Sequence, residues 1–355
     1  MSNRMRLLCL GLLLLTQQVS VRADILIGGF GNTTTPQSLL RFADAANGNV
    51  APISTLGGVA TAFQTPIAGI YEPLEDVVYV ADFYGQSIRV FPVGASGDVA
   101  PKRVVGPDYV SQVRSIAVDV THAELLITST CCYKVFDRTA NGNAFYKRYV
   151  QWGGLTGSVT QQNSPAALVY MAPTDEVAET DTDSASPYTP KVLVFNRTDS
   201  GNTAPKRVLK GTSTQLGTYA GALAYDASSR KLFIGAFNTN PDSSRSGRIL
   251  VFDDMDDGNV APLRSIAGSL TGLELTASGN IAGLAIDPKR QRLLVSVSDY
   301  NIAANNKVLE FDLTASGNVL PLQTIAGTLT GFPLSLGTPI WAPDRVFANG
   351  FESAP

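Results

Sequence analysis

The densest group of side chains that could do chemistry lies between residues 175 and 183. Carboxylates crowd a stretch that we interpret as a loop over residues 171–190, namely Asp175, Glu176, Glu179, Asp181 and Asp183. Because Ca²⁺ prefers oxygen ligands, these residues are candidates for a peripheral calcium site. An unstructured acidic insertion is the alternative. A second acidic run at 253–257 has Met255 and Arg264 where an EF-hand loop needs ligands, so a solvated turn is favoured there.

Two cysteines are adjacent in the sequence, at Cys131 and Cys132. Residues 1–23 contain arginines, an apolar stretch and a small-residue cleavage site, which are typical of a secretory signal peptide. Export would remove Cys9 and leave the pair in an oxidising compartment, where we expect a vicinal disulfide. Reduced structural thiols are the alternative, and a zinc or redox site lacks companion ligands.

Histidine occurs once, at His122. A histidine-ligated zinc site, a Ser-His-Asp triad and a Cys-His dyad are therefore implausible. The sequence also lacks G-x-S-x-G and the dinucleotide-binding pattern. We expect His122 to be a solvated turn residue, and the composition favours a binding protein over an enzyme.

The elements that must position these residues are marked by a phrase that occurs six times. Each copy has phenylalanine, glycine six residues later and then Asn or Asp, beginning at Phe42, Phe91, Phe136, Phe195, Phe252 and Phe311. The glycines are Gly48, Gly97, Gly142, Gly201, Gly258 and Gly317. Successive phenylalanines are 49, 45, 59, 57 and 59 residues apart, which is the length of a propeller blade.

Each phrase lies within a predicted four-stranded antiparallel meander. The clearest copy has strands at 68–71, 77–81, 87–91 and 102–105, and further first strands fall at 115–119, 167–170, 222–226 and 282–287. Residues 24–57 contain three strands without a first, whereas 339–344 form one strand with nothing after it. Joining these ends predicts an all-β, six-bladed β-propeller over residues 24–344, with one blade closed by both termini.

Residues 69–91, GIYEPLEDVVYVADFYGQSIRVF, resemble the NHL repeat with its "giavd", "yVaD" and "rIqvF" strands. The resemblance implies that first strands line the axis and fourth strands are outermost. Asp82 and Asp299 match the repeat's second-strand aspartate, whereas Ser129 and Phe237 depart from it. NHL-type propellers include enzymes, binding modules and scaffolds, so the resemblance does not select a function.

The glycine of each phrase suits a left-handed position in a bulged hairpin turn. Basic pairs then begin three of the fourth strands, at Lys102-Arg103, Lys147-Arg148 and Lys206-Arg207. We expect these pairs to protect the outer edge of the sheet, with a basic binding band as the alternative.

Connections between second and third strands, and between blades, vary in length and share one face of the ring. Because variable loops on a rigid scaffold commonly carry function, we expect binding there. The candidate ligand-binding residues are Tyr84, Trp152, Asn238, Asn240, Tyr300 and Asn301.

The charge balance argues against two classes of partner. A net charge of −3 and a pI of about 5.3 offer no attraction for nucleic acid or an anionic membrane. We expect a secreted or periplasmic, non-enzymatic binding module for a protein, glycan or small molecule, with no cofactor beyond peripheral calcium. Residues 345–355 form a tail resembling the "IF-x-D/N-G-F-E" ending of exported bacterial proteins.

The alternative function is a divergent calcium-dependent lactonase or other hydrolase. That chemistry requires carboxylates where the first strands begin, near the axis. The residues predicted there, such as Arg114, Ser164 and Asn280, include no acid. The acids Asp119, Asp226, Asp287 and Asp344 fall at the opposite ends of those strands, where Asx-turns are expected.

Overall fold

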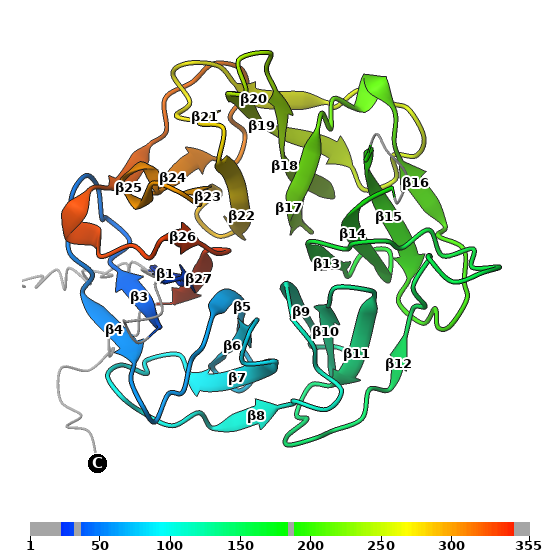
Figure 1. Ribbon diagram of the computed structural model, residues 1–355, viewed down its shortest axis with the longest axis horizontal. Helices are drawn as coiled ribbons and strands as arrows, with labels where there is room; N and C mark the ends of the chain where they lie inside the picture. The colour runs from blue at the N-terminus through cyan, green and yellow to red at the C-terminus, as the bar shows by residue number, and fades with distance from the viewer. Residues whose placement is uncertain (1–22, 32–36, 184–187, 344–355) are drawn as a thin grey trace, which may run out of the picture.

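The computed structural model describes residues 23–31, 37–183 and 188–343, which form a ring of six four-stranded antiparallel blades (Figure 1). The predicted all-β, six-bladed propeller is therefore confirmed. Residues 1–22 of the predicted signal peptide and the tail at 345–355 lie outside the described residues.

The strands follow the same order in every blade, from the axis outward. Blade 1 contains β27 (Ile340–Pro343), β1 (Ala23–Ile27), β3 (Ser38–Phe42) and β4 (Ser54–Gly57). Blade 2 contains β5 (Pro66–Glu72), β6 (Val77–Asp82), β7 (Ser87–Pro92) and β8 (Arg103–Val105). Blade 3 contains β9 (Ser115–Asp119), β10 (Glu124–Thr128), β11 (Tyr133–Asp137) and β12 (Arg148–Tyr149).

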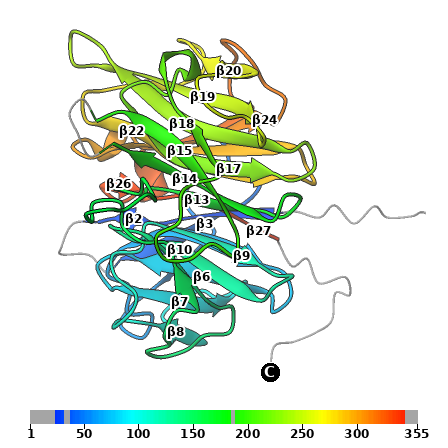
Figure 2. The same cartoon turned by 90° about the vertical axis from the view of Figure 1, so that its right-hand side faces the viewer.

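The second half of the ring repeats this order with longer strands. Blade 4 contains β13 (Leu168–Met171), β14 (Glu176–Thr182), β15 (Pro190–Asn196) and β16 (Arg207–Leu209). Blade 5 contains β17 (Tyr219–Asp226), β18 (Lys231–Thr239), β19 (Arg245–Asp253) and β20 (Arg264–Ala267). Blade 6 contains β22 (Gly279–Asp287), β23 (Arg292–Asp299), β24 (Lys307–Asp312) and β25 (Gln323–Ala326). Figure 2 shows these blades from the side of the ring.

Few elements lie outside the blades. They are the short pair β2 (Gly29–Phe30) with β26 (Ser335–Leu336), β21 (Glu274–Leu275) beside β19, and the 3₁₀ turns η1 (Thr212–Thr214), η2 (Ala303–Asn305) and η3 (Thr328–Thr330). No helix in the described chain has the length and apolar character needed to cross a membrane.

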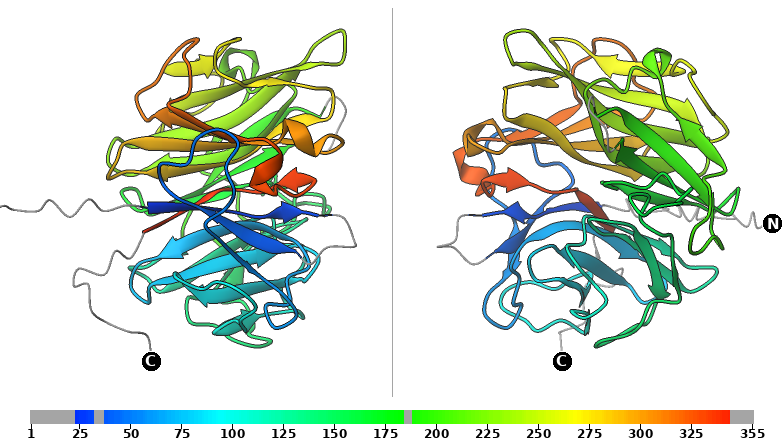
Figure 3. Two further views of the ribbon diagram at one scale, coloured as in Figure 1. Left: turned by 90° about the vertical axis from the view of Figure 1, so that its left-hand side faces the viewer. Right: turned by 45° about the vertical axis from the view of Figure 1, so that its right-hand side comes forward.

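Blade 1 closes the ring with both ends of the described chain. Strand β1 pairs with β27, with Leu26 opposite Ile340 and Ile25 opposite Trp341 (Figure 3). Removing free edges in this way is how a propeller avoids open strand pairing. The split blade is confirmed, but Ala342, opposite Asp24, takes the register position predicted for Asp344, which lies outside the described residues.

The phenylalanine of each phrase joins its blade to the preceding one. Phe91 belongs to the same apolar cluster as Leu26 and Ile340 of blade 1, and Phe195 meets the Tyr133 ring of blade 3 at 5.8 Å. The members of this set are each at most 1% exposed, namely Phe42, Phe91, Phe136, Phe195, Phe252 and Phe311. Apolar burial between blades therefore sets the repeat.

The glycine of each phrase forms a second inter-blade contact, which we call the rim clasp. In blade 4 the Gly201 N–H donates to the Tyr149 carbonyl of blade 3 at 2.8 Å, and the Gly201 carbonyl accepts from Gln151. The same pair of bonds occurs at Gly48, Gly97, Gly142, Gly258 and Gly317, and all six glycines have a φ between 62° and 79°. A left-handed backbone at these points explains the glycine.

The residue after each clasp glycine secures the link that leaves the preceding blade. Asn202 accepts from the Val159 N–H at 2.8 Å, and Asp98 accepts from the Ala60 N–H at 2.7 Å. Asn49, Asn259 and Asn318 make equivalent bonds. The phrase is therefore an inter-blade joint as well as a turn.

Two sequence predictions about the rim and the acidic loop are wrong. The stretch predicted as the 171–190 loop contains strand β14, which pairs with β13 and β15. Arg207 is 7% exposed because its guanidinium pairs with Glu176 inside the blade, so it does not protect an edge. Arg103 and Arg148 are similarly covered by Glu75 and Glu124, while the preceding lysines stay partly exposed.

Candidate functional site

The first strands bring one residue from each blade to the same level of the axis. Each of these residues pairs with a residue of the second strand, and that second-strand residue pairs in turn with the phenylalanine of the repeated phrase. The set, which we call the axial ring, is Trp341, Tyr71, Val118, Tyr170, Tyr225 and Ile286. Strands β5, β9, β13, β17, β22 and β27 surround this axis in Figure 1.

The axial ring lines a cavity of about 530 Å³. The cavity lies toward the turns that join first to second strands, since Pro73, Pro288 and Arg290 of those turns also line it. Its walls are mainly aliphatic and aromatic, and its volume is in the range of small-molecule sites. We refer to this side as the turn face and to the side of the variable connections as the loop face.

Three tyrosines of the ring are held by the same kind of contact. The hydroxyls of Tyr71 and Tyr170 donate to Asp76 and Asp175, both at 3.0 Å. The Tyr225 hydroxyl donates to Asp254 at 2.8 Å.

These contacts keep the phenol groups neutral and fixed. Burial raises the pKa of Tyr170 and of Tyr225, and the hydrogen bonds to Asp175 and Asp254 add to the rise. The rings therefore present rigid aromatic surface to the cavity.

Trp341 adds one unused polar group to the apolar wall. Its indole N–H is buried and has no hydrogen-bond partner among the described residues. Buried donors are normally paired, so this group needs a partner that the protein itself does not supply.

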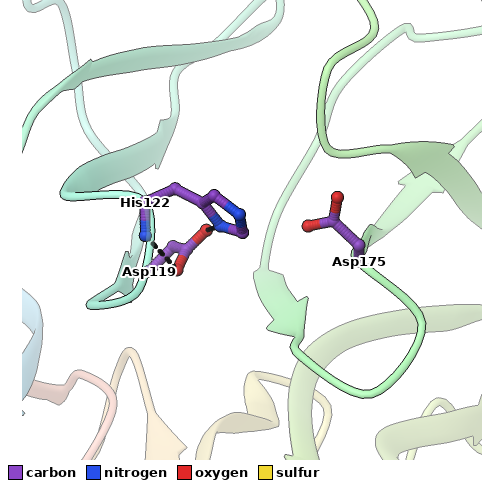
Figure 4. A group of neighbouring side chains, drawn as sticks. All are labelled: Asp119, His122 and Asp175. Atoms are coloured by element: carbon purple, nitrogen blue, oxygen red, sulfur yellow. Dashed lines mark hydrogen bonds and ion pairs between the residues drawn. The ribbon is translucent and has the colours of Figure 1, made fainter.

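A group with metal-ligand composition lies beside the cavity, between blades 3 and 4. Ligand atoms of Asp119, His122 and Asp175 lie within 4.8 Å of one another (Figure 4). The Asp119 carboxylate accepts the His122 N–H at 3.1 Å and lies 2.6 Å from His122 Nδ1. The predicted turn position of His122 is confirmed, but its partnership with Asp175 was not foreseen.

Arg197 already supplies a cation to this group. Its Nε donates to Asp175 at 2.6 Å and lies 3.7 Å from Asp119, and its Nη1 donates to Glu124 at 3.2 Å. Although burial opposes it, the hydrogen bonds from Arg197 and Tyr170 lower the pKa of Asp175. A divalent metal would have to displace or tolerate this guanidinium, so the group works as an inter-blade ion pair.

The five carboxylates predicted as a calcium site have separate partners. Asp175 pairs with Arg197, Glu176 with Arg207, and Asp183 with both Lys191 and Lys210. Arg207 and Lys206 lower the pKa of Glu176 to about 2 despite its desolvation. Asp175 precedes strand β14, Asp183 follows it, and Glu176 lies on the opposite face from Glu179 and Asp181, so the structure does not gather the five around one point.

Asp181 has the same role in blade 4 as Asp82 has in blade 2. It accepts the backbone N–H groups of Asn163 and Ser164, each at 2.8 Å, as Asp82 accepts those of Gln64 and Thr65. Glu179 is fully buried, and its Oε1 accepts from Gln162 at 2.6 Å. Burial raises the pKa of Glu179 well above its usual value.

The six ligand-binding candidates lie on four separate parts of the loop face. Tyr84 is 56% exposed and packs edge-to-face against Phe30 and Phe83, at centroid distances of 5.4 and 5.1 Å. Trp152 is 40% exposed on the link between blades 3 and 4. The remaining candidates are Asn238 and Asn240 on the β18–β19 hairpin and Tyr300 and Asn301 on the β23–β24 connection.

Several of these candidates have structural contacts. Asn240 Nδ2 donates to Ser244 at 2.9 Å, and the Asn301 N–H donates to Asp299 at 3.0 Å. The Tyr300 hydroxyl accepts from Asn280 at 2.7 Å near the loop-face end of the axis. Asn238 instead lines a pocket between blades 4 and 5.

Cys131 and Cys132 are joined as a disulfide in the connection between β10 and β11. Neighbouring Ser129 donates its hydroxyl to the Cys132 carbonyl at 3.1 Å. The pair therefore belongs to a short loop-face turn, and its oxidation state in solution stays a prediction.

The axial ring was not predicted from the sequence, because the candidate catalytic positions were sought at the other ends of the first strands. A signal was present, because Tyr71, Val118, Tyr225 and Ile286 each precede an acid at a strand end. Those acids do form turns, as expected: Asp119, Asp226 and Asp287 accept backbone N–H groups two or three residues later. Their regular position could have revealed the ring.

Comparisons with known proteins agree on the fold. No protein-family model matches the chain, and no curated protein matches it. A chain of the crystal structure of a nidogen/laminin complex aligns over 90% of this chain and 98% of its own length, with a TM-score of 0.57 and 15% identity. A protein from Lactobacillus plantarum aligns over 86% of this chain and 82% of its own, with a TM-score of 0.52 and 18% identity. This chain is a six-bladed β-propeller, and the NHL resemblance remains a prediction.

Proposed function

We propose that the protein is a non-catalytic ligand-binding propeller whose main site is the axial cavity. The observation that carries this proposal is the axial ring, which places four aromatic side chains around about 530 Å³ of space. Aromatic walls with one or two polar groups suit a small apolar or aromatic ligand.

The acids around the cavity are committed to holding the fold. Asp119 and Asp287 hold turn backbone, and Glu72 accepts from the Leu74 N–H at 2.6 Å and pairs with Arg138. A general acid or base needs a free carboxyl within reach of substrate. This commitment supports binding in place of catalysis.

The test uses Trp341 as a reporter. The chain has two tryptophans, so Trp152→Phe leaves Trp341 as the single one. Titration with ANS, an aromatic dye with one sulfonate group, should then show saturable energy transfer from Trp341. In this background, Val118→Tyr should weaken dye binding by about tenfold, or about 1.4 kcal/mol, because it narrows the cavity.

Val118→Tyr is expected to fold, since blades 2, 4 and 5 already have tyrosine at that register. Val99→Tyr, at a partly exposed rim position, is the matched control and should leave dye binding unchanged. Equal dye affinity in the two variants would refute the axial site.

A protein partner on the loop face is a second candidate function. The aromatic cluster of Phe30, Phe83 and the exposed Tyr84 supports it, because aromatic groups are enriched in interface centres. We expect this surface to act independently of the axial cavity. Tyr84→Ser should then abolish partner capture while leaving ANS transfer from Trp341 intact.

The calcium-dependent lactonase has weaker support. At the loop-face end of the axis, Arg114 donates to Ser164 at 3.1 Å and Arg245 donates to the Gly279 carbonyl at 2.6 Å. Their positive charge opposes Ca²⁺ at the place where this chemistry needs it. Chelator-sensitive hydrolysis of lactones by the protein would overturn the non-catalytic proposal.

A further inference from the structure

A second pocket, of about 470 Å³, lies on the loop face between blades 4 and 5. It is lined by the link that precedes β17, by the start of β15, and by Asn238 and Arg248 from the β18–β19 hairpin. This pocket belongs to neither the axial cavity nor the Tyr84 cluster.

Arg248 is the one charged side chain among the described residues that line it. The guanidinium is half-buried, and no carboxylate, carbonyl or ring of the described chain interacts with it. Removing a charge from water without a partner is costly, and burial accordingly lowers the pKa of Arg248. The site therefore has an uncompensated positive charge.

Blade 4 neutralises the cation at this position with an acid of its own. Lys191 has the same register as Arg248, opposite the fourth strand, and it donates to Asp183 at 3.0 Å and to the Gln161 carbonyl at 2.7 Å. In blade 5 the residue at the register of Asp183 is Asn238. The acid is replaced by a neutral amide, so the described chain supplies no negative charge to Arg248 at this register.

The rest of the lining offers neutral hydrogen-bonding groups in fixed positions. The turn at Gly217 has a φ of 72°, and a Cβ there would lie 2.5 Å from the Phe237 carbonyl oxygen. The next residue, Thr218, donates its N–H to that carbonyl at 2.8 Å. This joint holds the turn against β18, next to Asn238, whose side-chain amide has no partner among the described residues.

We propose that this pocket binds the carboxylate group of a small organic acid. The planar guanidinium of Arg248 matches the two oxygens of a carboxylate, and hydroxyl and amide groups such as Thr212 and Asn238 complete the contacts. One unpaired cation balances one negative charge, which favours a monoanion over a phosphate dianion. The volume leaves room for a ring or a short chain beyond the carboxylate.

The test follows ¹⁹F relaxation of 4-fluorobenzoate with the full-length protein, using 4-fluorobenzamide as the uncharged analogue. The acid should bind, and the amide should bind about tenfold more weakly. Arg248→Met and Arg248→Gln should each weaken the acid by at least about tenfold. No relaxation change at about 10 mM acid, or equal binding to the protein and both variants, would overturn the proposal.

Two further variants separate ligand binding from a structural role. Lys307→Met is the matched control, since Lys307 has the same register in blade 6 but lines neither cavity, and it should leave affinity unchanged. Asn238→Asp restores the acid of blade 4 and should abolish 4-fluorobenzoate binding while raising the melting temperature. ANS transfer from Trp341 should persist in every variant, so failure of this site and failure of the axial site are distinguishable.

Discussion

The rim and the loop face of the ring treat equivalent positions of the blades in opposite ways. At the rim, the clasp at Gly201 uses the same two backbone bonds as the clasps of the other five blades. On the loop face, blade 4 joins Lys191 to Asp183, whereas blade 5 leaves Arg248 beside the neutral Asn238. Repetition at the rim holds neighbouring blades together, and departures from repetition at the loop face mark the places where we propose binding.

This difference suggests where substitutions should matter for folding and where they should matter for binding. Joints that recur in each blade bury apolar or paired groups, so breaking one should destabilise the ring. Positions that vary among blades have weaker structural constraints. The following variants test that division.

The largest effect is expected at the closing strand. Ile340 is 3% exposed and packs with Leu26 across the β1–β27 pair. Ile340→Asp should cost about 4 to 5 kcal/mol in the free energy of unfolding, because it buries an unpaired charge. Ile340→Val should cost about 1 kcal/mol. Denaturant unfolding measures both, and similar midpoints for the two variants would argue against closure by β27.

The next largest effect is expected at the buried ion pair of blade 4. Arg207→Met should cost about 3 kcal/mol, because Glu176, at 1% side-chain exposure, would lose its main partner. Lys206 contacts the same carboxylate but is 47% exposed, so Lys206→Met should cost about 0.5 kcal/mol or less. If chemical denaturation shows that Lys206→Met lowers the free energy of unfolding more than Arg207→Met does, Lys206 is the main partner of Glu176 and the prediction is wrong.

A smaller effect is expected at Asn202, the residue that follows the clasp glycine of blade 4. Asn202→Ala removes the acceptor of the Val159 N–H and the donor to the Gly157 carbonyl, and it should cost about 1 kcal/mol. Asn202→Asp keeps the acceptor, as Asp98 does in blade 2, and should cost less. Thermal unfolding of the two variants measures this difference. Equal losses of stability would show that the bond donated to the Gly157 carbonyl contributes the stability.

The smallest change in the free energy of unfolding is expected for Glu179→Gln at acidic pH. This change should increase as the pH rises. Its pKa is raised in the folded protein, chiefly by burial and then by Asp181, so the folded state holds a proton that the unfolded state has lost. Stability contributed by this group should therefore decrease as pH rises above about 4.3, the unfolded value. Glu179→Gln should unfold like the parent near pH 4 and be the more stable protein at pH 8. A difference independent of pH would contradict this assignment.

The local sequence predicted most of the scaffold. The period of the phenylalanines identified the blades, and β9 has the predicted bounds of 115–119. The prediction failed at residues 175–183, where the high charge suggested a loop. In the structure strand β14 pairs Glu176 with Arg207, and Asp181 accepts the Ser164 N–H of the link between blades 3 and 4. Tertiary ion pairs and backbone donors overrode the low strand propensity of those residues.

The candidate sites were less accessible to sequence reasoning. Tyr84 and Asn238 were identified as loop-face residues, but the arginine beside Asn238 was not, since Arg248 is separated from it by the turn of a hairpin. The sequence predicted binding at the loop face and did not predict the larger cavity, which lies on the axis.

The sequence alone determined the number of blades, their closure by both termini and the glycine of each joint, because those features depend on local period and backbone conformation. The tertiary structure decided which side chains meet. Trp341 and Tyr71 are 270 residues apart, and they share the axial ring because closure sets their strands in the same register. Likewise, Arg248 lacks an acid because Asn238 occupies the register that Asp183 has in blade 4, a relation that exists only once the strands have paired.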